Sequence, residues 1–479
     1  MMDTAAHVLV FPWPRQGHIN PILHFATALV DAGLQVSFLH TERNLRRLAQ
    51  APLLGLRLLS IPDGLPEDQP CSFLDLMESM CTTGSAAYRA LLLSLLSAVD
   101  APVTCVVADG TMPFAFDIAE ELGIPALAFA PHSVCSYLAL LSMPKLLELG
   151  EAAFPADDPV RGVPGMEGFL RRRDLPRGLS FAEKGDGDPL VLKLAEVTAR
   201  SCKARALIIN TAASMEGPAL AHIASCACEV FAVGPLHARS TIAESERRKR
   251  EPVAGGRRVH GLAGRPRGPF TEFLSGLAAT GYAFLWVLRP GMVQMTSSKL
   301  LGETVEAVGG GRGRVVEWAP QRDVLRHRAL LGESVEAVGG GRGRVVEWAP
   351  QRDVLRHRAV GCFLTHAGWN STLECAVEGV PMVCWPFFAD QQTNSRFVDA
   401  VWKTGLDMKD VCDRGVVEKT VREVMISDEI KEAAQAMAQQ LRLNIAEAGS
   451  SSFQFERLVR FIGELNISSS LMKPRMNED

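Results

Sequence analysis

Short apolar runs alternate with helical stretches along both halves of the chain. In the first half, helices are predicted at 20–32 and 113–122, and the predicted strands are 7–11, 34–40, 103–108, 125–130, 206–210 and 229–233. In the second half, helices are predicted at 370–378 and 390–402, and the strands are 283–288, 344–348, 361–366 and 381–385. This alternation is typical of right-handed crossovers and of a parallel sheet covered on both faces. The pattern therefore predicts two α/β units in series.

Length and composition agree with two large domains. The chain has 479 residues, is 47% hydrophobic and carries a formal net charge of −4, so nucleic acid is not an expected partner. No apolar run approaches the ~20 residues needed to span a bilayer. The eleven cysteines include no Cys-x-x-Cys pair, which favours reduced thiols and a cytoplasmic location over a disulfide framework or a zinc site. We expect a monomer.

Two segments interrupt the alternation. Residues 151–190 are rich in Pro, Gly and charged residues and are expected to form surface loops. Residues 237–269 lack a strand pattern and hold eight Arg or Lys between 247 and 267. A solvated linker is the plainest interpretation. A nucleic-acid patch is disfavoured because aromatic side chains are missing from the basic stretch.

Polar residues at the ends of predicted strands are the first candidates for chemistry, because ligands bind beyond the carboxyl ends of strands in open parallel sheets. His18 lies in FPWPRQGHINP after the first strand, and Asp109 follows the strand at 103–108. A carboxylate can orient an imidazole and stabilise its protonated form, so the pair is a candidate general base with its orienting group. A purely structural or capping His18 is the alternative.

A stronger signal follows the strand at 361–366, in the segment FLTHAGWNSTLE. His366 and the N-cap candidates Asn370 and Ser371 lead into a helix. Free backbone N–H groups and the positive end of the helix dipole suit a phosphate group. A capped helix without a ligand has the same spacing, so the spacing alone leaves both interpretations open.

The stretch from Trp348 to Gln391, WAPQRDVLRHRAVGCFLTHAGWNSTLECAVEGVPMVCWPFFADQ, resembles the 44-residue signature box of plant family 1 UDP-glycosyltransferases. GHINP, RRRDLP, FAVGPL, FLWVLRP and TGLDMKD are similar to other landmarks of that family, so the resemblance covers nearly the whole chain. It implies a GT-B fold, in which two Rossmann-like domains face each other across a cleft. The implied division is an acceptor domain, a basic linker, a donor domain and a C-terminal helix with a tail, at 1–236, 237–269, 270–450 and 451–479.

The resemblance also implies roles for single residues. Trp348 would stack on uracil and the Ala349 backbone would read the base edge, while Gln351 and Glu374 would hold the ribose. The donor-binding residues at the start of the helix would be His366, Gly368, Trp369, Asn370 and Ser371, of which His366, Asn370 and Ser371 would take the pyrophosphate. Asp390 and Gln391 would hydrogen-bond the sugar, and a terminal glutamine is usual among family members that use glucose.

His18 then resembles the family's general base, oriented by Asp109. It would take the proton of an acceptor hydroxyl as that oxygen attacks the anomeric carbon, with inversion. His366 and the helix dipole would stabilise departing UDP, so no metal or other cofactor is expected. The resemblance thus implies a UDP-glucose-dependent inverting O-glycosyltransferase acting on a small hydroxylated plant metabolite. A Rossmann oxidoreductase is disfavoured, because no Gly-x-Gly-x-x-Gly follows the first strand.

Two features depart from the family pattern. Residues 300–329 and 330–359 are tandem copies that differ only at Thr304 and Ser334, as a local duplication or an error in the predicted gene would produce. We expect one copy to loop out or pack at the surface, with Trp348 rather than Trp318 facing the donor. The basic segment stands where the family has an apolar strand, which predicts the loss of that strand. A catalytically impaired nucleotide-sugar-binding homologue is therefore the alternative function.

Overall fold

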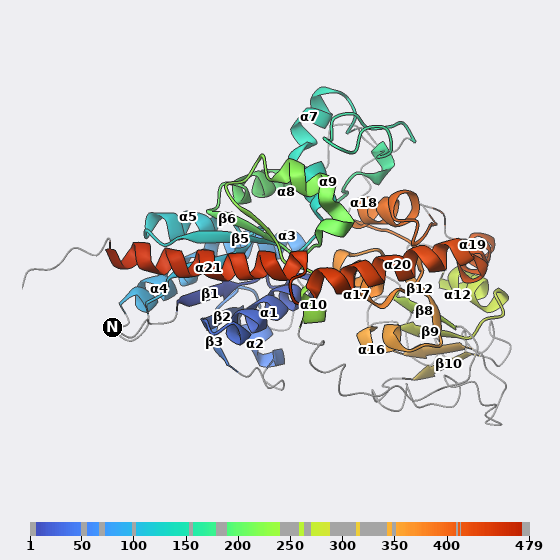
Figure 1. The fold of residues 1–479 in the computed structure, drawn as a ribbon, viewed down its shortest axis with the longest axis horizontal. Coiled ribbons are helices and arrows are strands. Elements are labelled where there is room, and N and C mark those ends of the chain that lie inside the picture. Colours follow the sequence, from blue (N-terminus) through green and yellow to red (C-terminus); the bar gives the residue numbers. More distant parts are fainter. Residues whose placement is uncertain are drawn as a thin grey trace, which may run out of the picture.

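Each half of the chain folds around its own sheet of seven parallel strands (Figure 1). The strand orders are β3-β2-β1-β4-β5-β6-β7 and β10-β11-β9-β8-β12-β13-β14. This arrangement confirms the predicted α/β class with two Rossmann-like units. The structure is a computed structural model, and it describes residues 6–48, 55–66, 72–97, 102–152, 157–178, 189–239, 258–262, 270–287, 313–316, 343–346, 351–408, 411 and 413–471.

The first sheet alternates with helices, as the hydrophobic pattern predicts. Its strands are β1 (His7–Phe11), β2 (Gln35–Thr41), β3 (Leu56–Ile61), β4 (Cys105–Asp109), β5 (Ala126–Ala130), β6 (Ala206–Ile209) and β7 (Val230–Ala232). The helices of this half are α1 (Gln16–Asp31), α2 (Glu42–Leu48), α3 (Phe73–Ser79), α4 (Ser85–Leu96), α5 (Pro113–Glu121), α6 (Val134–Leu141), α7 (Met143–Glu148), α8 (Pro189–Ser201), α9 (Ala213–Ile223) and α10 (Leu236–Arg239).

The second sheet is built in the same way. Its strands are β8 (Arg258–Leu262), β9 (Phe284–Val287), β10 (Gly313–Val316), β11 (Gly343–Val346), β12 (Val360–Thr365), β13 (Met382–Cys384) and β14 (Gly405–Asp407). The helices that follow α10 are α12 (Phe270–Ala279), α16 (Gln351–Arg356), α17 (Trp369–Glu378), α18 (Gln391–Arg396), α19 (Arg414–Ile426), α20 (Asp428–Ile445) and α21 (Ser450–Leu471). Shorter turns are η1 (Met80–Gly84), η2 (Arg172–Asp174) and η3 (Phe397–Val401).

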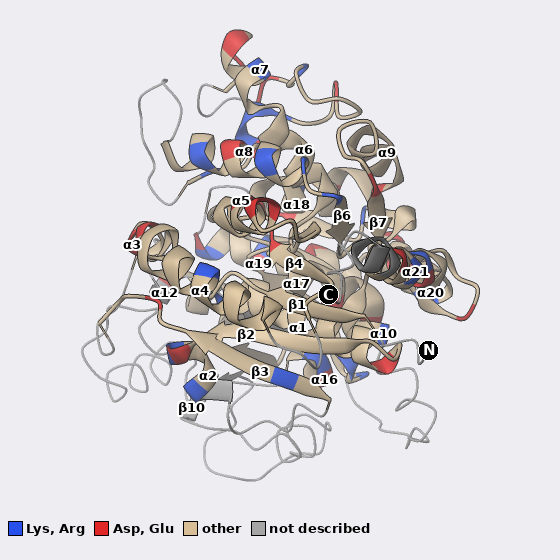
Figure 2. Ribbon diagram, turned by 90° about the vertical axis from the view of Figure 1, so that its left-hand side faces the viewer, with Lys and Arg blue, Asp and Glu red and all other residues tan. Residues whose placement is uncertain are grey.

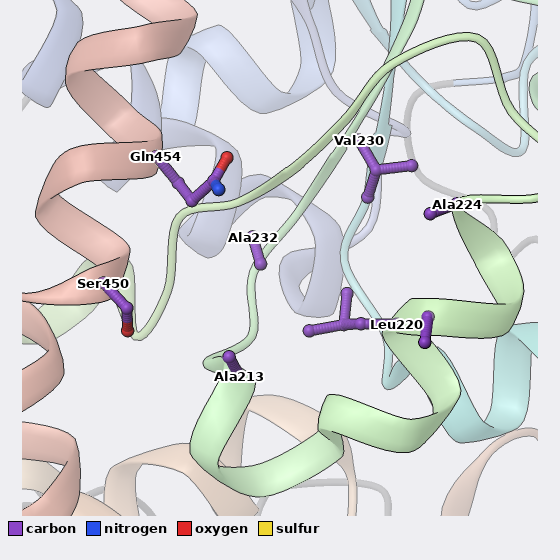
Figure 3. A pocket seen from close by; sticks show the side chains of 8 residues that line it. Ala213, Leu220, Ala224, Val230, Ala232, Ser450 and Gln454 are labelled. Atoms are coloured by element: carbon purple, nitrogen blue, oxygen red, sulfur yellow. The ribbon is translucent and has the colours of Figure 1, made fainter.

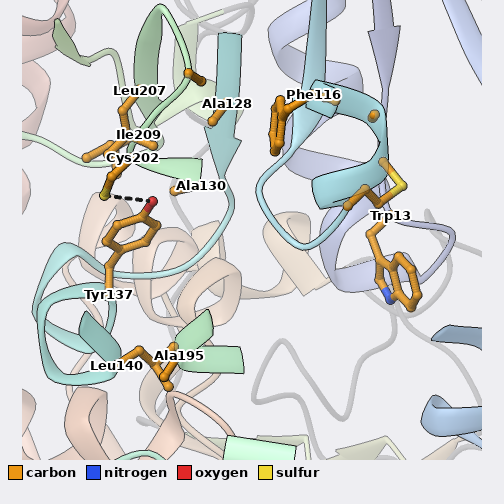
Figure 4. Packing of buried hydrophobic residues seen from close by; sticks show 14 of the residues in the cluster. Trp13, Phe116, Ala128, Ala130, Tyr137, Leu140, Ala195, Cys202, Leu207 and Ile209 are labelled. Carbon is orange, nitrogen blue, oxygen red and sulfur yellow. Dashed lines mark hydrogen bonds between the residues drawn. The ribbon is translucent and has the colours of Figure 1, made fainter. Parts of the chain in front are cut away.

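The first sheet is buried on both faces, which explains why its central strands are mostly apolar, with His7 at the start of β1 and Asp109 at the end of β4 as polar residues. In β1, Leu9 and Phe11 pack into the core on one face, whereas Val8 and Val10 pack into the core on the other. Figure 4 shows part of the first of these cores. Alternate residues of one strand thus serve two separate cores, as the period of a strand requires.

The long helix α21 returns from the second domain to the first (Figure 1). Its buried side chains Phe455, Leu458, Ile462 and Leu465 belong to the same core as Val8 of β1. Their spacing of three and four residues places them on one face of the helix. The C-terminal helix expected at 451–479 is therefore part of the first domain's core.

The basic segment contains a strand. The backbone of β8 pairs in parallel with β9 and with β12, so this strand occupies the centre of the second sheet. The prediction that residues 237–269 lack this strand is therefore wrong. The prediction relied on a run of apolar side chains, whereas the ladder itself uses backbone N–H and C=O groups that every non-proline residue supplies.

Both copies of the repeat contribute a strand. Residues 313–316 in β10 pair in parallel with 343–346 in β11, and β11 pairs with β9 on its other side. The expectation that one copy stays out of the sheet is therefore wrong for these residues. An open sheet has unpaired backbone groups along its edge, and the first copy occupies that edge while the second occupies an interior position.

The segment predicted as surface loops is partly a core element. Among its described residues, Val160, Val163 and Leu170 are buried in a core of the first domain. The same segment reaches the second domain, where the Thr393 hydroxyl donates to the Asp174 carbonyl at 2.8 Å. Its Pro, Gly and charged residues concealed this role, because isolated apolar residues in a loop have no period to detect.

Lys and Arg are interspersed with Asp and Glu over the helices of both domains (Figure 2). No helix within the described ranges is long and apolar enough to cross a bilayer. Each of the nine cysteines in those ranges is a free thiol.

Candidate active site

The two residues predicted as a general base and its orienting group lie together. His18 is in the first turn of α1 and Asp109 ends β4, the strand next to β1. The His18 Nδ1 atom is 2.8 Å from Asp109 Oδ2, with the histidine side chain 25% exposed and the aspartate side chain fully buried. The imidazole edge bearing Nε2 is thus the part that an incoming hydroxyl can meet.

Asp109 stays ionised despite its burial. Burial acts to raise the pKa of this carboxyl, but His18 and the Thr111 backbone and hydroxyl outweigh it and hold the pKa below its usual value. Thr111 donates to Asp109 Oδ1 from its backbone at 3.0 Å and from its hydroxyl at 2.7 Å. A fixed negative charge therefore faces Nδ1 and favours protonation at that nitrogen.

Asn370 joins this base to the second domain. Pro21 lies inside α1 and has no N–H, so it cannot donate to the carbonyl of Gly17 four residues earlier. Asn370 Nδ2 donates to that carbonyl at 2.5 Å. The start of α17 is thereby held next to His18, which brings the predicted phosphate-binding residues to the predicted base.

The turn between β12 and α17 is tightly packed around His366. A Cβ atom on Gly368 would lie 2.5 Å from His366 Nε2, so a larger residue would require the ring or the turn to move. Ala367, which lies between His366 and Gly368 in this turn, has a positive φ of 60°. Gly368 is the N-cap of α17 and has no side chain to cap the helix, so a bound anion can approach the backbone N–H groups there.

The predicted ribose-binding residues are also in contact. Gln351, in the first turn of α16, donates from Nε2 to Glu374 at 2.8 Å and to the Ser371 hydroxyl at 3.1 Å. Burial raises the pKa of Glu374 above its usual value, although the Gln351 hydrogen bond opposes this. Trp348 and Ala349, the predicted uracil contacts, lie outside the described residues.

Asp390 and Gln391 are the residues predicted to bind the sugar. Asp390 Oδ2 accepts a hydrogen bond from Asn394 Nδ2 at 2.9 Å. Burial raises the Asp390 pKa to about 6, with Asn394 and the charge of His18 opposing the rise. Gln391 Oε1 accepts from the backbone N–H groups of Phe387 and Phe388 at 2.8 and 3.1 Å, so its amide N–H groups are the part that can meet a sugar hydroxyl.

Trp369 differs from the rest of the predicted set. Its side chain is buried in a core shared by the two domains, and its Nε1 atom donates to the Asn210 carbonyl at 2.9 Å. The indole therefore serves the domain interface. Any contact with a donor would come from the Trp369 backbone.

Two residues near the site were missed from the sequence. His132 follows β5, its ring stacks on Tyr137 at 5.4 Å, and burial followed by the charge of His18 lowers its pKa to about 4. Asn394 lies one helical turn beyond Asp390. Two signals in the sequence could have indicated them: His132 follows a predicted strand, and Asn394 lies four residues after Asp390.

An apolar pocket of about 270 Å³ lies apart from these residues, between α9, β7 and the start of α21 (Figure 3). It is lined by Ala213, Leu220, Ala221, Ala224, Val230, Ala232, Ser450 and Gln454. None of the predicted site residues lines it. Within the described ranges, no group of three His, Cys, Asp or Glu is placed to hold a metal ion.

Solved structures share this architecture over nearly the whole chain. A UDP-glucose:anthocyanidin 3-O-glucosyltransferase crystallised with UDP superposes with a TM-score of 0.76 at 21% identity, covering 97% of this chain and all of that one. A Polygonum tinctorium UDP-glucosyltransferase capable of glucosylating indoxyl gives a TM-score of 0.74 at 24% identity, covering 97% and 100%. These similarities show a two-domain GT-B fold.

Curated relatives and a family model define the family. The model for UDP-glucoronosyl and UDP-glucosyl transferase matches residues 331–441. A myricetin 3-O-rhamnoside 1,2-glucosyltransferase from Crocosmia x crocosmiiflora is 40% identical, covering 96% of both chains. A 7-deoxyloganetic acid glucosyltransferase from Catharanthus roseus is 36% identical, covering 97% of this chain and 99% of the relative. The chain belongs to the plant family 1 UDP-glycosyltransferases, enzymes that transfer a sugar from a UDP-sugar to small plant metabolites.

Proposed function

We propose that this enzyme transfers glucose from UDP-glucose to a hydroxyl group of a small plant metabolite, with inversion at the anomeric carbon. The observation that carries the proposal is the His18 Nδ1–Asp109 Oδ2 contact of 2.8 Å beside the start of α17. It supplies a base for a hydroxyl next to a helix end suited to a pyrophosphate. The first-named relatives, both glucosyltransferases, support glucose as the sugar.

In the proposed reaction, the acceptor hydroxyl lies against His18 Nε2. Its oxygen attacks the anomeric carbon as its proton passes to His18, and the bond from that carbon to the UDP oxygen breaks. Asp109 stabilises the imidazolium that forms. Attack from the face opposite UDP converts an α-linked donor into a β-glucoside.

The donor is proposed to lie along the second domain, with uracil, ribose, pyrophosphate and glucose each bound by a different group of residues. Trp348 and Ala349 take uracil, and Gln351 with Glu374 takes the ribose, consistent with the hydrogen bond between their side chains. His366, Asn370 and Ser371 take the pyrophosphate at the start of α17, against the backbone of Gly368 and Trp369. Asp390 and Gln391 take the glucose hydroxyls.

The test is turnover of UDP-glucose with a panel of acceptors, followed as UDP release and as product mass. The panel includes simple phenols, terpenoid alcohols, myricetin 3-O-rhamnoside and 7-deoxyloganetic acid. We expect a β-glucoside from at least one class, and a preference for UDP-glucose over UDP-galactose and UDP-glucuronic acid. A retained anomeric configuration, or faster transfer from another UDP-sugar, would contradict the proposal.

The alternative of a catalytically impaired homologue depended on the loss of a central strand. Because β8 occupies that place in the sheet, this reason no longer applies. We further propose a cytoplasmic enzyme that is active as a monomer. Free cysteines throughout the described ranges support the location, and the contribution of both domains of one chain to the site supports the monomer.

A further inference from the structure

Asn394 uses all three polar groups of its amide at the junction of the two domains. Its side chain is buried, and the Ser133 hydroxyl donates to its Oδ1 atom at 2.7 Å. Its Nδ2 atom donates to Asp390 Oδ2 and to the Ala367 carbonyl, each at 2.9 Å. A side-chain amide is the group that can accept one hydrogen bond and donate two at a single position.

The three partners of Asn394 belong to three different parts of the site. Asp390 is the proposed sugar-binding carboxylate. Ala367 is in the turn between His366 and α17, at a positive φ that an alanine rarely adopts. Ser133 is the N-cap of α6 in the first domain, where its oxygen also accepts the Ser136 N–H at 3.2 Å.

We propose that Asn394 is a positioning residue that sets the Asp390 carboxylate toward the donor sugar and fixes it to the phosphate turn and to the first domain. The inference rests on the proposed function, since it assumes that Asp390 binds the sugar. Asn394 itself touches neither sugar nor phosphate in this role. It acts by donating to Oδ2 of Asp390, whose carboxyl group also receives the Trp369 backbone N–H, so that the carboxylate is held in one orientation toward the sugar.

Aspartate at position 394 is the sharpest substitution, because it keeps the shape and removes both N–H donors. A second carboxyl group would face Asp390 and the Ala367 carbonyl, and the one proton that such a pair shares cannot replace both N–H groups of Asn394. We expect the ratio of UDP-glucose affinity to UDP affinity in Asn394→Asp to fall about tenfold or more, because hydrogen bonds to charged groups contribute about 1.5–3 kcal/mol. The KM for UDP-glucose should rise more than the KM for the acceptor.

Thr393→Val is the matched control. It removes a buried hydrogen bond between the same two domains, Thr393 Oγ1 to the Asp174 carbonyl, one residue away on the same helix and without contact to Asp390. We expect this variant to keep the wild-type affinity ratio even where its stability falls. Ser133→Ala removes the link to the first domain and the N-cap of α6 but keeps the Asn394–Asp390 bond, so it should lower the ratio by less than Asn394→Asp does.

Calorimetric titration of each variant with UDP-glucose and with UDP gives the ratio without depending on turnover. Equal ratios in Asn394→Asp and Thr393→Val would overturn the positioning role. If Asn394→Asp does not fold, Asn394→Ala decides the same comparison, because it adds no charge. A wild-type chain that bound UDP and UDP-glucose equally while transferring no glucose would instead contradict the proposed function, whatever Asn394 does.

Discussion

At the scale of single residues, His18 is where the proposed chemistry meets the acceptor. Replacing it with alanine should lower kcat by roughly 10²–10⁴-fold, the usual contribution of a general base. UDP affinity should remain near the wild-type value, because the imidazole serves the acceptor hydroxyl. Steady-state kinetics and calorimetry measure the two effects, with His222→Ala, an exposed histidine of α9, as the control. Unaltered turnover in His18→Ala would remove this residue from the mechanism.

Gly368 gives a second test, because the space for a side chain there is already filled. In Gly368→Ala the new methyl group would lie 2.5 Å from His366 Nε2, so the ring or the turn must move. UDP binding should weaken as the phosphate-binding turn is displaced. Gly463→Ala in α21 is the control, since nothing lies within 4 Å of its new methyl group. It should leave UDP binding unchanged and increase stability by about 1 kcal/mol. Equal UDP affinities in the two variants would contradict this account.

Asp390 predicts a pH dependence of donor binding. Burial raises its pKa to about 6, so the group is protonated below that pH and ionised above it. A carboxylate accepts stronger hydrogen bonds from sugar hydroxyls than a neutral carboxyl does. UDP-glucose affinity should therefore fall as the pH falls through about 6, and the pyrophosphate of UDP-glucose, unlike the terminal phosphate of UDP, has no ionisation of its own near that pH. Asp390→Asn should lose the step, and a step that persisted in that variant would show that Asp390 is not its source.

At the scale of elements, the strands that were predicted correctly are those whose side chains are mostly apolar and buried. β1, β4 and β12 were found because they are buried on both faces. β3 was missed because it is only partly buried at most of its positions, and β8 because a basic stretch surrounds it. The side-chain pattern reports burial, whereas the ladder that defines a strand is made by backbone groups.

The same limit applies to the site. The contact between His18 and Asp109 was predictable because Asp109 ends one strand and His18 follows the neighbouring strand, at the edge where a parallel sheet collects its ligand-binding residues. The Gly17 carbonyl and Ser133 were missed because each meets a partner from the other domain, and no local pattern records such a contact. For the Gly17 carbonyl the sequence did contain a local signal. Pro21 has no N–H, so the carbonyl four residues earlier lacks its donor within the helix and is open to a donor from elsewhere.

The repeat offers a prediction at the scale of one element, because its two copies place the same sequence in two positions of one sheet. β11 of the second copy is interior and leads directly to Gln351, which is bonded to Glu374. Trp348→Ala should weaken UDP binding by about 1–3 kcal/mol, the usual contribution of an aromatic ring stacked on a base. Trp318→Ala is a control with nearly identical local sequence and should change UDP affinity little. Equal losses in calorimetric titrations of the two variants would contradict the assignment.

At the scale of the whole molecule, the two domains are joined by more than the chain between them. Trp369 and Leu373 of α17 share a core with Ala212 and Met215 of the first domain. Arg352 of α16 donates to the His237 carbonyl at 2.6 Å. The residues proposed to bind donor and acceptor are thus held together by packed contacts at the interface, and α21 connects the second domain back to the first.

Because α21 packs on the first domain, residues near the end of the chain contribute to the stability of that domain. Leu458 of α21 is fully buried against the sheet, whereas Phe453, on the same helix, is 59% exposed. Leu458→Ala should lower the free energy of unfolding by about 2–5 kcal/mol, as for other buried leucines, and Phe453→Ala by less than about 0.5 kcal/mol. Hydrogen exchange followed by mass spectrometry locates the effect. Amides of β1 and β4 should exchange faster in Leu458→Ala than in Phe453→Ala, while those of β12 and β13 should change little, because the lost contacts belong to the first domain. Faster exchange confined to the second domain would show that α21 stabilises the half of the chain from which it emerges and not the half on which it packs.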